Sequence, residues 1–284
     1  MMNKTKINYL THTWNPLAMR CTRVDAGCAN CWHIAMAKRL AKNPKLHSGM
    51  RASYAGEYQP VLCRWNEPML RKTPSVVGVQ FMGDIGHEHI EPVDAALVFN
   101  MMGMTQHHTY VVLTKRPERV AEIMRKLWEG RVMPNIWIGV SVHDQASADE
   151  RIPILLQIPA AGHFVSYEPA LSAVDFSLMG TAPKAWGRGY KPLGELIGGV
   201  IMGGESGPGA RPMDPQWARD TRDQCGAAGT CYFMKQMGTH WARNTPHCEG
   251  GISVARLGDS SGSNIKLWPP DLLVRELPWE MPNA

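Results

Sequence analysis

Short apolar, β-branched runs alternate with helical segments along most of the chain, and this alternation most constrains how it can fold. Seven runs have the length of strands, at residues 7–14, 79–82, 110–113, 135–142, 163–166, 196–202 and 230–234. Stretches with apolar residues three or four positions apart lie between them, at 92–104, 118–127, 146–156 and 215–226. Such units give right-handed crossovers and a parallel sheet. We therefore predict an α/β fold, either open and doubly wound or curled into a partial or full TIM-like (β/α) barrel of about six or seven strands.

Composition sets the class of protein. The chain has 284 residues, of which 44% are hydrophobic and 19% charged, and no stretch approaches the roughly 20 apolar residues of a membrane span. We expect a soluble protein without a membrane partner. The first residues lack the apolar core of a secretory signal, so we expect a cytoplasmic location and reduced cysteines. The net charge of +5 permits a polyanionic partner.

We expect residues 1–240 to form the barrel domain and 241–284 a C-terminal extension packed on it. A loop-rich insertion at about 42–74 is a candidate cover for the barrel mouth, and 181–194 resembles a second, flexible insertion.

Polar residues follow the predicted strands directly. They are Asp84, His87 and Glu88; Thr114, Lys115 and Arg116; Ser141 and His143; Ser166 and Glu168; Gly203, Gly204, Glu205 and Ser206; and Lys235 and Gln236. Each of these residues alone is more typical of a helix cap or a solvated loop. Because parallel strands end at one edge, their repetition predicts a shared polar mouth.

Three cysteines, Cys21, Cys28 and Cys31, follow the first predicted strand with the spacing C-x6-C-x2-C. Gly27 permits a tight turn before the second cysteine, and a helical pattern begins near Trp32. Three thiolates leave one position of a metal site open, which favours chemistry over scaffolding. The spacing also allows ordinary buried thiols or a structural zinc site completed by a histidine.

The histidine that completes such a structural zinc site would be one such as His33 or His12. The remaining cysteines, Cys63, Cys225, Cys231 and Cys248, are more typical of core thiols than of a second cluster.

Several longer motifs resemble a known family. They are TWNP at 13–16, GCANCW at 27–32, LTKRPERV at 113–120, IWIGVSV at 136–142, FVSYEPAL at 164–171, VIMGGESGPGARPMDPQWARDTRDQC at 200–225 and FMKQMG at 233–238. Together they resemble a phage-associated family of formerly unknown function, whose cysteine loop is similar to that of radical S-adenosylmethionine (SAM) enzymes. The sequence departs from the commonest spacing of that superfamily, C-x3-C-x2-C, and has Trp32 where tyrosine is frequent.

The resemblance implies a barrel of the radical SAM type and a [4Fe-4S] cluster on Cys21, Cys28 and Cys31, with the amino and carboxylate groups of SAM on the fourth iron. Reduction would then cleave SAM to a 5′-deoxyadenosyl radical that abstracts hydrogen from a substrate. An electron donor such as flavodoxin or ferredoxin is implied as a partner.

Roles for other residues follow from this resemblance and from their position after strands. The candidate cofactor contacts are Trp32, Gly83, Asp84, Glu88, Ser141, Glu168, Gly203, Gly204 and Glu205. Candidate substrate contacts are Asn15, Lys115 and Arg116, and candidate catalytic residues are Arg211, Lys235 and Gln236.

The substrate we expect is a nucleic acid, DNA above all, or a nucleotide. Cations and aromatics interleave at Arg51, Tyr54, Tyr58, Arg64 and Trp65, a pattern that suits phosphate contact and base stacking. Rearrangement of a modified thymidine in phage DNA hypermodification, an isomerase reaction in the host cytoplasm, would fit. Two alternatives remain open: a nucleic-acid-binding or regulatory module stabilised by a structural metal, and a radical SAM enzyme acting on a peptide or small metabolite.

Overall fold

The computed structural model describes residues 2–57, 59–176, 196–246 and 253–282. Its centre is an eight-stranded sheet in the order β1-β2-β5-β6-β7-β8-β9-β10. The strands are β1 (Asn3–Lys4), β2 (His12–Trp14), β5 (Val76–Val79), β6 (Thr109–Thr114), β7 (Ile136–Val142), β8 (Gly162–Tyr167), β9 (Gly199–Gly203) and β10 (Cys231–Gln236). All neighbouring pairs are parallel except β1 with β2. The predicted α/β class with a parallel sheet is confirmed.

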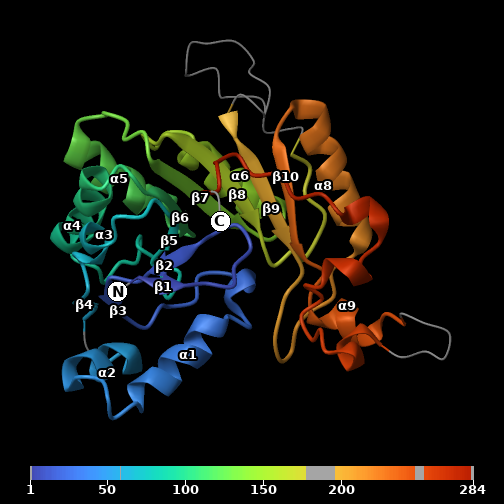
Figure 1. Cartoon of the computed structure of the whole chain (residues 1–284), viewed down its shortest axis with the longest axis horizontal. Helices are drawn as coiled ribbons and strands as arrows, with labels where there is room; N and C mark the ends of the chain where they lie inside the picture. Colours follow the sequence, from blue (N-terminus) through green and yellow to red (C-terminus); the bar gives the residue numbers. More distant parts are fainter. Residues whose placement is uncertain (1, 58, 177–195, 247–252, 283–284) are drawn as a thin grey trace.

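The sheet is open in the described part of the chain, because β1 and β10 lie at its two edges and do not pair with each other. Figure 1 shows the strands in an arc with helices on its outer side. These helices are α4 (Pro92–Met104), α5 (Pro117–Trp128), α6 (Gln145–Leu155) and α8 (Pro215–Ala228). Each begins with a residue suited to that position: Pro at the start of α4, α5 and α8, and a capping box between Asp144 and Ser147 at α6.

The helices agree closely with the predicted ranges, whereas the first two strands differ. Only His12–Trp14 of the predicted strand 7–14 is a strand, because residues 7–10 turn and pack under the sheet. The second strand ends at Val79 and not at Met82.

Side chains alternate between two cores along each strand, as a period of two requires. The outer core holds Tyr110 and Val112 of β6 and Val165 of β8 against the helices. The inner core holds Val76, Val111, Phe164, Ile201 and Phe233, with Tyr9 and Trp279 packed on them.

The next inward positions along these strands are polar. On the inward face of β7, Trp137 is followed by Gly139 and then Ser141, and on that of β8, Phe164 is followed by Ser166. Gly139 is required there because a Cβ atom would lie 2.4 Å from the Phe164 ring. An apolar plug therefore fills the inside of the arc and polar groups lie above it.

The insertion at 42–74 has more structure than the loop-rich segment predicted. It contains α2 (Ser48–Ala55), β4 (Val61–Leu62) and α3 (Glu67–Leu70), and β4 pairs with β3 (Leu17–Ala18). Helix α2 packs on α1 (Trp32–Ala41) through a small core that includes Ala18, Ala37 and Tyr54. Tyr54 is thus buried and not available for base stacking, while Trp65 is exposed. Tyr58 and the predicted insertion at 181–194 lie outside the described residues.

The C-terminal residues pack on the β10 side of the sheet. After α9 (Thr239–Asn244) come the short 3₁₀ helices Val254–Leu257, Ile265–Leu267 and Pro270–Leu272. The Met234 amide then donates to Val274 at 2.9 Å, and the Glu276 amide donates to Tyr232 at 2.8 Å. These bonds cover the edge of β10. No helix in the described ranges is long and apolar enough to cross a membrane.

Candidate functional site

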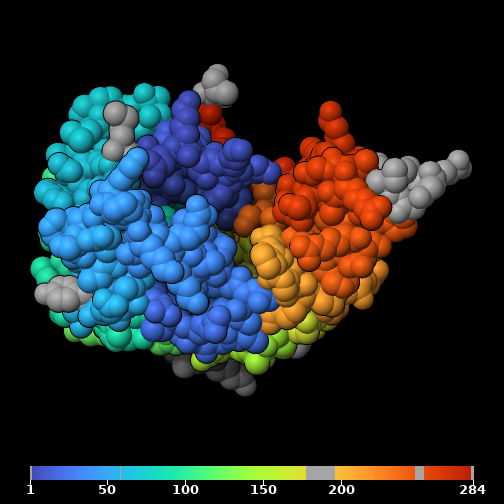
Figure 2. All heavy atoms as spheres, turned by 90° about the horizontal axis from the view of Figure 1, so that it is seen from below, coloured from blue at the N-terminus to red at the C-terminus, as the bar shows by residue number. Residues whose placement is uncertain are grey.

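A cavity of about 500 Å³ opens at the carboxyl ends of the parallel strands. Strands β5 to β10 each supply lining residues from their ends or from the loops that follow, including Asp84, Lys115, Ser141, Glu168, Glu205 and Lys235. Figure 2 looks at this side of the molecule and shows a hollow between the blue N-terminal part and the orange C-terminal part. The cavity lies in the size range of cofactor and substrate sites.

Cys21, Cys28 and Cys31 all line this same cavity. Their loop follows β3, passes through a 3₁₀ turn (Ala26–Cys28) and ends where α1 begins at Trp32. Within the described residues no three His, Cys, Asp or Glu side chains are gathered tightly enough to enclose a metal ion. The donor set nevertheless fits an iron–sulfur cluster, because three thiols share one cavity and basic side chains lie against two of them.

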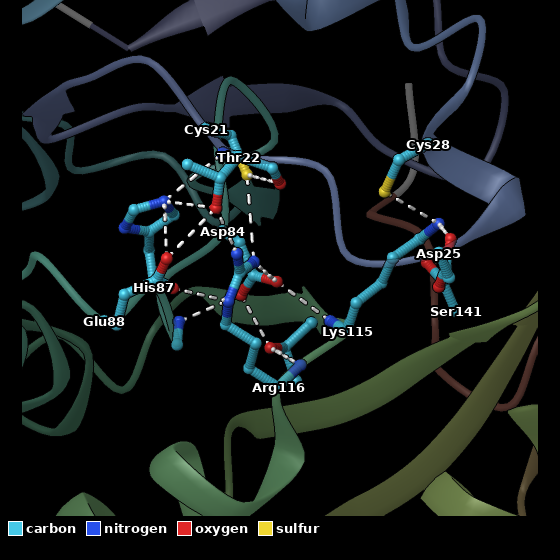
Figure 3. A network of polar contacts seen from close by, with 12 residues as sticks. Cys21, Thr22, Asp25, Cys28, Asp84, His87, Glu88, Lys115, Arg116 and Ser141 are labelled. Carbon is cyan, nitrogen blue, oxygen red and sulfur yellow. Dashed lines mark hydrogen bonds and ion pairs between the residues drawn. The ribbon is translucent and has the colours of Figure 1, made fainter. Parts of the chain in front are cut away.

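Those basic side chains are Lys115 and Arg116, which follow β6. Lys115 Nζ lies 3.4 Å from Cys28 Sγ, and Arg116 Nη1 lies 3.8 Å from Cys21 Sγ (Figure 3). Burial raises the pKa of Cys21 to about 12, although Arg116 opposes the shift. Both cations therefore contact the cysteine loop, and both also line the cavity, so their predicted contact with substrate stays a prediction.

Asp84 holds the end of β6 in place. It is buried, and Oδ1 accepts from Thr114 Oγ1 at 2.6 Å and from the Gly86 amide at 2.9 Å. Oδ2 accepts from the Lys115 amide at 2.9 Å and from Arg116 Nη1 at 3.3 Å. Since four donors occupy this carboxylate, it is a scaffold for the Lys115-Arg116 turn; it also lines the cavity, and its contact with an ammonium group stays a prediction.

Glu88 and Thr22 complete the contacts of Arg116. Arg116 Nε lies 2.9 Å from Glu88 Oε2, and Arg116 Nη2 donates to Thr22 Oγ1 at 2.7 Å. Thr22 Oγ1 also donates to Glu88 Oε1 at 3.1 Å. Buried His87 lies 3.0 Å from the same hydroxyl through Nε2, and burial lowers its pKa to about 4. Glu88 thus braces the cysteine loop and does not line the cavity, and its contact with a cofactor stays a prediction.

Asp25 was not among the predicted site residues, yet it joins the cysteine loop to the turn after β6 and to helix α6. Lys115 Nζ donates to its Oδ1 at 2.9 Å, and Arg151 Nη2 donates to its Oδ2 at 2.5 Å. Burial alone would raise the pKa of Asp25, but Lys115 and Arg151 hold it well below its ordinary value. One signal was available: Asp25 is the single acid among residues 20–51.

Glu205 and Arg211 form a second brace, from β9 to the cysteine loop. Arg211 Nη2 donates to Glu205 Oε1 at 2.6 Å and Arg211 Nε to Oε2 at 2.9 Å. Asn30 Nδ2, between Cys28 and Cys31, donates to Glu205 Oε2 at 3.0 Å. The predicted catalytic Arg211 does not line the cavity, and its guanidinium is engaged by Glu205.

A third polar group, made of Glu168, Lys235 and Gln236, lies between the ends of β8 and β10. Lys235 Nζ donates to Glu168 Oε2 at 2.6 Å and Gln236 Nε2 to Oε1 at 3.1 Å. Burial alone would lower the pKa of Lys235, but Glu168 raises it well above its ordinary value. Glu168 and Lys235 line the cavity beside Tyr9, whose pKa burial raises to about 12.

Three further predicted residues, Asn15, Gly203 and Gly204, do not line the cavity, whereas a fourth, Gly83, does. Asn15 Oδ1 accepts from the Met82 amide at 2.8 Å and does not line the cavity. A Cβ atom at Gly204 would lie 2.3 Å from the Met237 carbonyl oxygen, so this glycine allows two backbones to meet and not a ligand to approach. A Cβ atom at Gly203 would lie 3.3 Å from the side-chain carbon Cγ of Gln236. Gly83 does line the cavity, with φ at +144°.

Three serines present hydroxyls to the cavity without a hydrogen-bond partner among the described residues. They are Ser141 of β7, Ser166 of β8 and Ser206 after β9. Trp32 also lines the cavity and is 53% exposed at its rim. Of the predicted cofactor contacts, Ser141 and Trp32 are therefore the ones left open to a ligand, and Ser166 and Ser206 join them.

The histidines of the structural-zinc alternative have other partners. His33 is buried, and its Nε2 accepts from the Cys21 amide at 3.3 Å. His12 Nδ1 lies 3.0 Å from Thr11 Oγ1, and neither ring lines the cavity. Cys225 is buried in the outer core, where burial raises its pKa to about 12, in agreement with a core thiol. Cys63 and Cys231 are partly exposed, and Cys248 lies outside the described residues.

Comparison with known proteins gives one assignment. No curated protein and no solved structure matches the chain. A family model described as "Protein of unknown function (DUF5131)" matches residues 4–265, a range that includes the cysteine loop, every parallel strand and the cavity. The chain is therefore a member of the DUF5131 family.

Proposed function

We propose that this protein is a radical SAM enzyme, with an open sheet of the partial-barrel type found in that superfamily. One observation carries the proposal: all three cysteines of the C-x6-C-x2-C loop line the cavity that the parallel strands line with polar residues. A [4Fe-4S] cluster bound to these thiolates would, together with SAM, supply a one-electron cleavage of a carbon–sulfur bond that yields a hydrogen-abstracting radical.

The residues after β6 suit the electrostatics of such a site. Three thiolates bring negative charge into a partly buried cavity, where isolated charges are costly. Lys115 and Arg116 lie within 3.4 and 3.8 Å of two of the sulfurs and offset that charge. Asp25 and Asp84 orient the two cations toward the loop, as second-shell partners orient ligands at metal sites.

The residues after β7, β8 and β9 suit a cofactor with hydroxyl, amino and carboxylate groups. Ser141, Ser166 and Ser206 can each donate and accept a hydrogen bond. The Glu168–Lys235 pair presents both signs of charge in the same cavity. The floor of the cavity is apolar and includes Ile7, Phe81 and other residues that pack on the inner core. Such a floor would exclude water from a reactive species.

The substrate in this proposal is a base of a nucleic acid, above all DNA, or a nucleotide, as in hypermodification of phage DNA. An isomerisation of a modified thymidine would use this chemistry. A low-potential donor such as flavodoxin or ferredoxin would supply the electron. The positive net charge of +5 and a cavity of about 500 Å³ support a polyanion that inserts one base.

The test is anaerobic reconstitution with iron and sulfide, followed by measurement of bound iron and of 5′-deoxyadenosine formed from SAM with dithionite as reductant. We expect about four irons per chain and production of the nucleoside. Cys28→Ala should lose SAM cleavage completely, whereas Cys225→Ala, the matched control in the outer core, should retain iron and activity. Stoichiometric zinc, no iron uptake and no SAM cleavage in the unaltered protein would support the structural-metal alternative instead.

A further inference from the structure

Positive charge is concentrated in one segment of the chain, residues 20–51, which we call the basic face. It holds seven of the 30 Lys and Arg residues but one of the 25 Asp and Glu residues, so it carries +6 while the rest of the chain carries −1. The basic face comprises the cysteine loop, α1 and the start of α2. In Figure 2 it forms the blue surface on one side of the hollow.

The charges of the basic face are not compensated within the described residues. Its one acid, Asp25, points inward and pairs with Lys115 and Arg151. Arg20 and Arg23 donate to the backbone carbonyls of Ala55 and Ala29, which orients the guanidinium groups without neutralising them. None of the seven cations forms an ion pair with a described residue, whereas some exposed cations elsewhere do.

Those paired cations show the contrast. Lys126 lies 2.7 Å from Glu122, and Arg219 lies 2.7 Å from Asp271. Exposed Lys72 and Arg243, however, also form no ion pair with a described residue, so the basic face differs from the rest of the surface in its concentration of cations with a single acid among them.

A second cavity, of about 440 Å³, lies in the basic face. Arg20, Arg23 and Lys38 line it together with His87 and His89, and no carboxylate does. Cys21 and Thr22 line both this cavity and the one at the carboxyl ends of the parallel strands, which we call the strand-end cavity. The cysteine loop therefore lies between the two cavities. Exposed Trp32 stands on the strand-end side of that loop.

We propose that the basic face binds the phosphate backbone of a nucleic-acid strand, with one base of that strand in the strand-end cavity and a neighbouring base on Trp32. This inference rests on the proposed function for what happens to the inserted base, but not for binding itself. Backbone binding needs cations along a path and an aromatic platform, and both are present beside the cavity.

An acidic protein, such as an electron donor, is the other polyanion that the charge would attract. Protein interfaces are anchored by buried apolar and aromatic side chains. The lining of the second cavity offers Ile34 and Pro60 and no aromatic side chain other than the two histidines. Phosphates need only the cations, and the exposed Trp32 suits a base, so the observations favour a nucleic acid.

The experiment measures binding of the reconstituted protein to a fluorescent single-stranded DNA oligonucleotide of on the order of 20 nucleotides, by anisotropy over a range of salt concentrations. The variant is Lys38→Gln/Arg39→Gln/Lys42→Gln, on exposed positions of α1 and the residue that follows it. The control is Arg125→Gln/Lys126→Gln/Arg131→Gln, which removes the same charge at and after the end of α5. 5′-Deoxyadenosine formation with dithionite is measured in parallel for every protein.

We expect the unaltered protein to bind with an affinity that falls steeply with salt. The α1 variant should bind at least about tenfold more weakly, with a salt slope reduced by about 2, since each lost phosphate contact removes about 0.7. The control variant should bind like the unaltered protein, and SAM cleavage with dithionite should be unchanged in both variants.

Three results would overturn the inference: no DNA binding, an equal loss in both variants, or an α1 variant that binds DNA normally but loses SAM cleavage only when reduced flavodoxin replaces dithionite. The last would assign the basic face to an acidic electron donor. DNA binding without SAM cleavage in any protein would instead reject the proposed function and leave the inference standing.

Discussion

The polar residues at the carboxyl ends of the parallel strands form a ring around the cavity. Its two halves, at β5 and β6 and at β7 to β9, use their side chains differently. After β5 and β6 the residues are charged, and each is bound to the cysteine loop or to a residue that holds it, as Asp84, Lys115 and Arg116 show. At the ends of β7, β8 and β9 the serines are neutral and have no partner among the described residues. The charged residues after β5 and β6 thus hold the cysteine loop, whereas the serines and the Glu168–Lys235 pair line the cavity without contacting that loop.

The largest effect on stability should come from removing the Asp84 carboxylate, at the centre of the charged half. Asp84→Ala removes a buried carboxylate that accepts four hydrogen bonds, and we expect a loss of about 3 kcal/mol in the free energy of unfolding. Glu88→Ala is the matched control, because Glu88 pairs with the same Arg116 but is 52% exposed. It should cost less than about 1 kcal/mol. Equal losses in urea titrations would show that Asp84 is not the scaffold we describe.

A second effect should appear as a dependence of stability on pH. Lys115 and Arg151 hold the pKa of Asp25 well below its ordinary value, so the stability it provides is present above about pH 4 and is lost as pH falls below that value. Asp25→Asn should therefore be less stable than the unaltered protein by about 1 to 2 kcal/mol at pH 7, and this difference should shrink toward pH 3. A difference that is constant from pH 7 to pH 3 would argue against the ion pairs.

A smaller effect should follow from crowding the contact between the loop and Lys115. A Cβ atom at Gly27 would lie 2.7 Å from Lys115 Nζ, so Gly27→Ala must displace the lysine from Cys28. We expect iron content after reconstitution to fall several-fold with little change in fold by circular dichroism. Gly226→Ala, in α8 with open space around it, is the control and should keep full iron content.

The smallest change in stability should come from the neutral half. Ser141→Ala and Ser166→Ala remove hydroxyls without a partner among the described residues, so unfolding should change by less than about 0.5 kcal/mol. If these hydroxyls hold SAM, KM for SAM should rise about fivefold to tenfold for each lost hydrogen bond. Unchanged KM values would show that the serines do not bind SAM, and the proposed difference between the two halves of the ring would then be wrong.

The sequence predicted the fold class and most elements, since period and length suffice for α4 at 92–104 and for β7 at 136–142. It did not predict the extent of β2, because Tyr9 and Leu10 are apolar like a strand but pack under the sheet. It also predicted that strand-end residues share one cavity with the three cysteines. It did not predict which of them bind each other, because that depends on distances between side chains far apart in sequence.

Lys115 and Asp25 illustrate this limit. A basic pair such as Lys115-Arg116 is typical of phosphate binding when seen alone, and only the position of the cysteine loop turns it inward. Ser166 and Ser206 gave no signal beyond their place after strands, yet they are open to the cavity. The basic face was visible in the sequence as a bias of charge, but the cavity that Arg20, Arg23 and Lys38 line without a carboxylate required the structure.

The measurement that tests the central claim most directly is electron paramagnetic resonance of the anaerobically reconstituted, reduced protein with and without SAM. The account predicts a [4Fe-4S]⁺ signal that changes on addition of SAM, because the three cysteines leave one iron open in the cavity. The signal should be lost in Cys21→Ala, Cys28→Ala and Cys31→Ala. A cluster signal that SAM does not perturb, or one that persists in all three variants, would contradict the account.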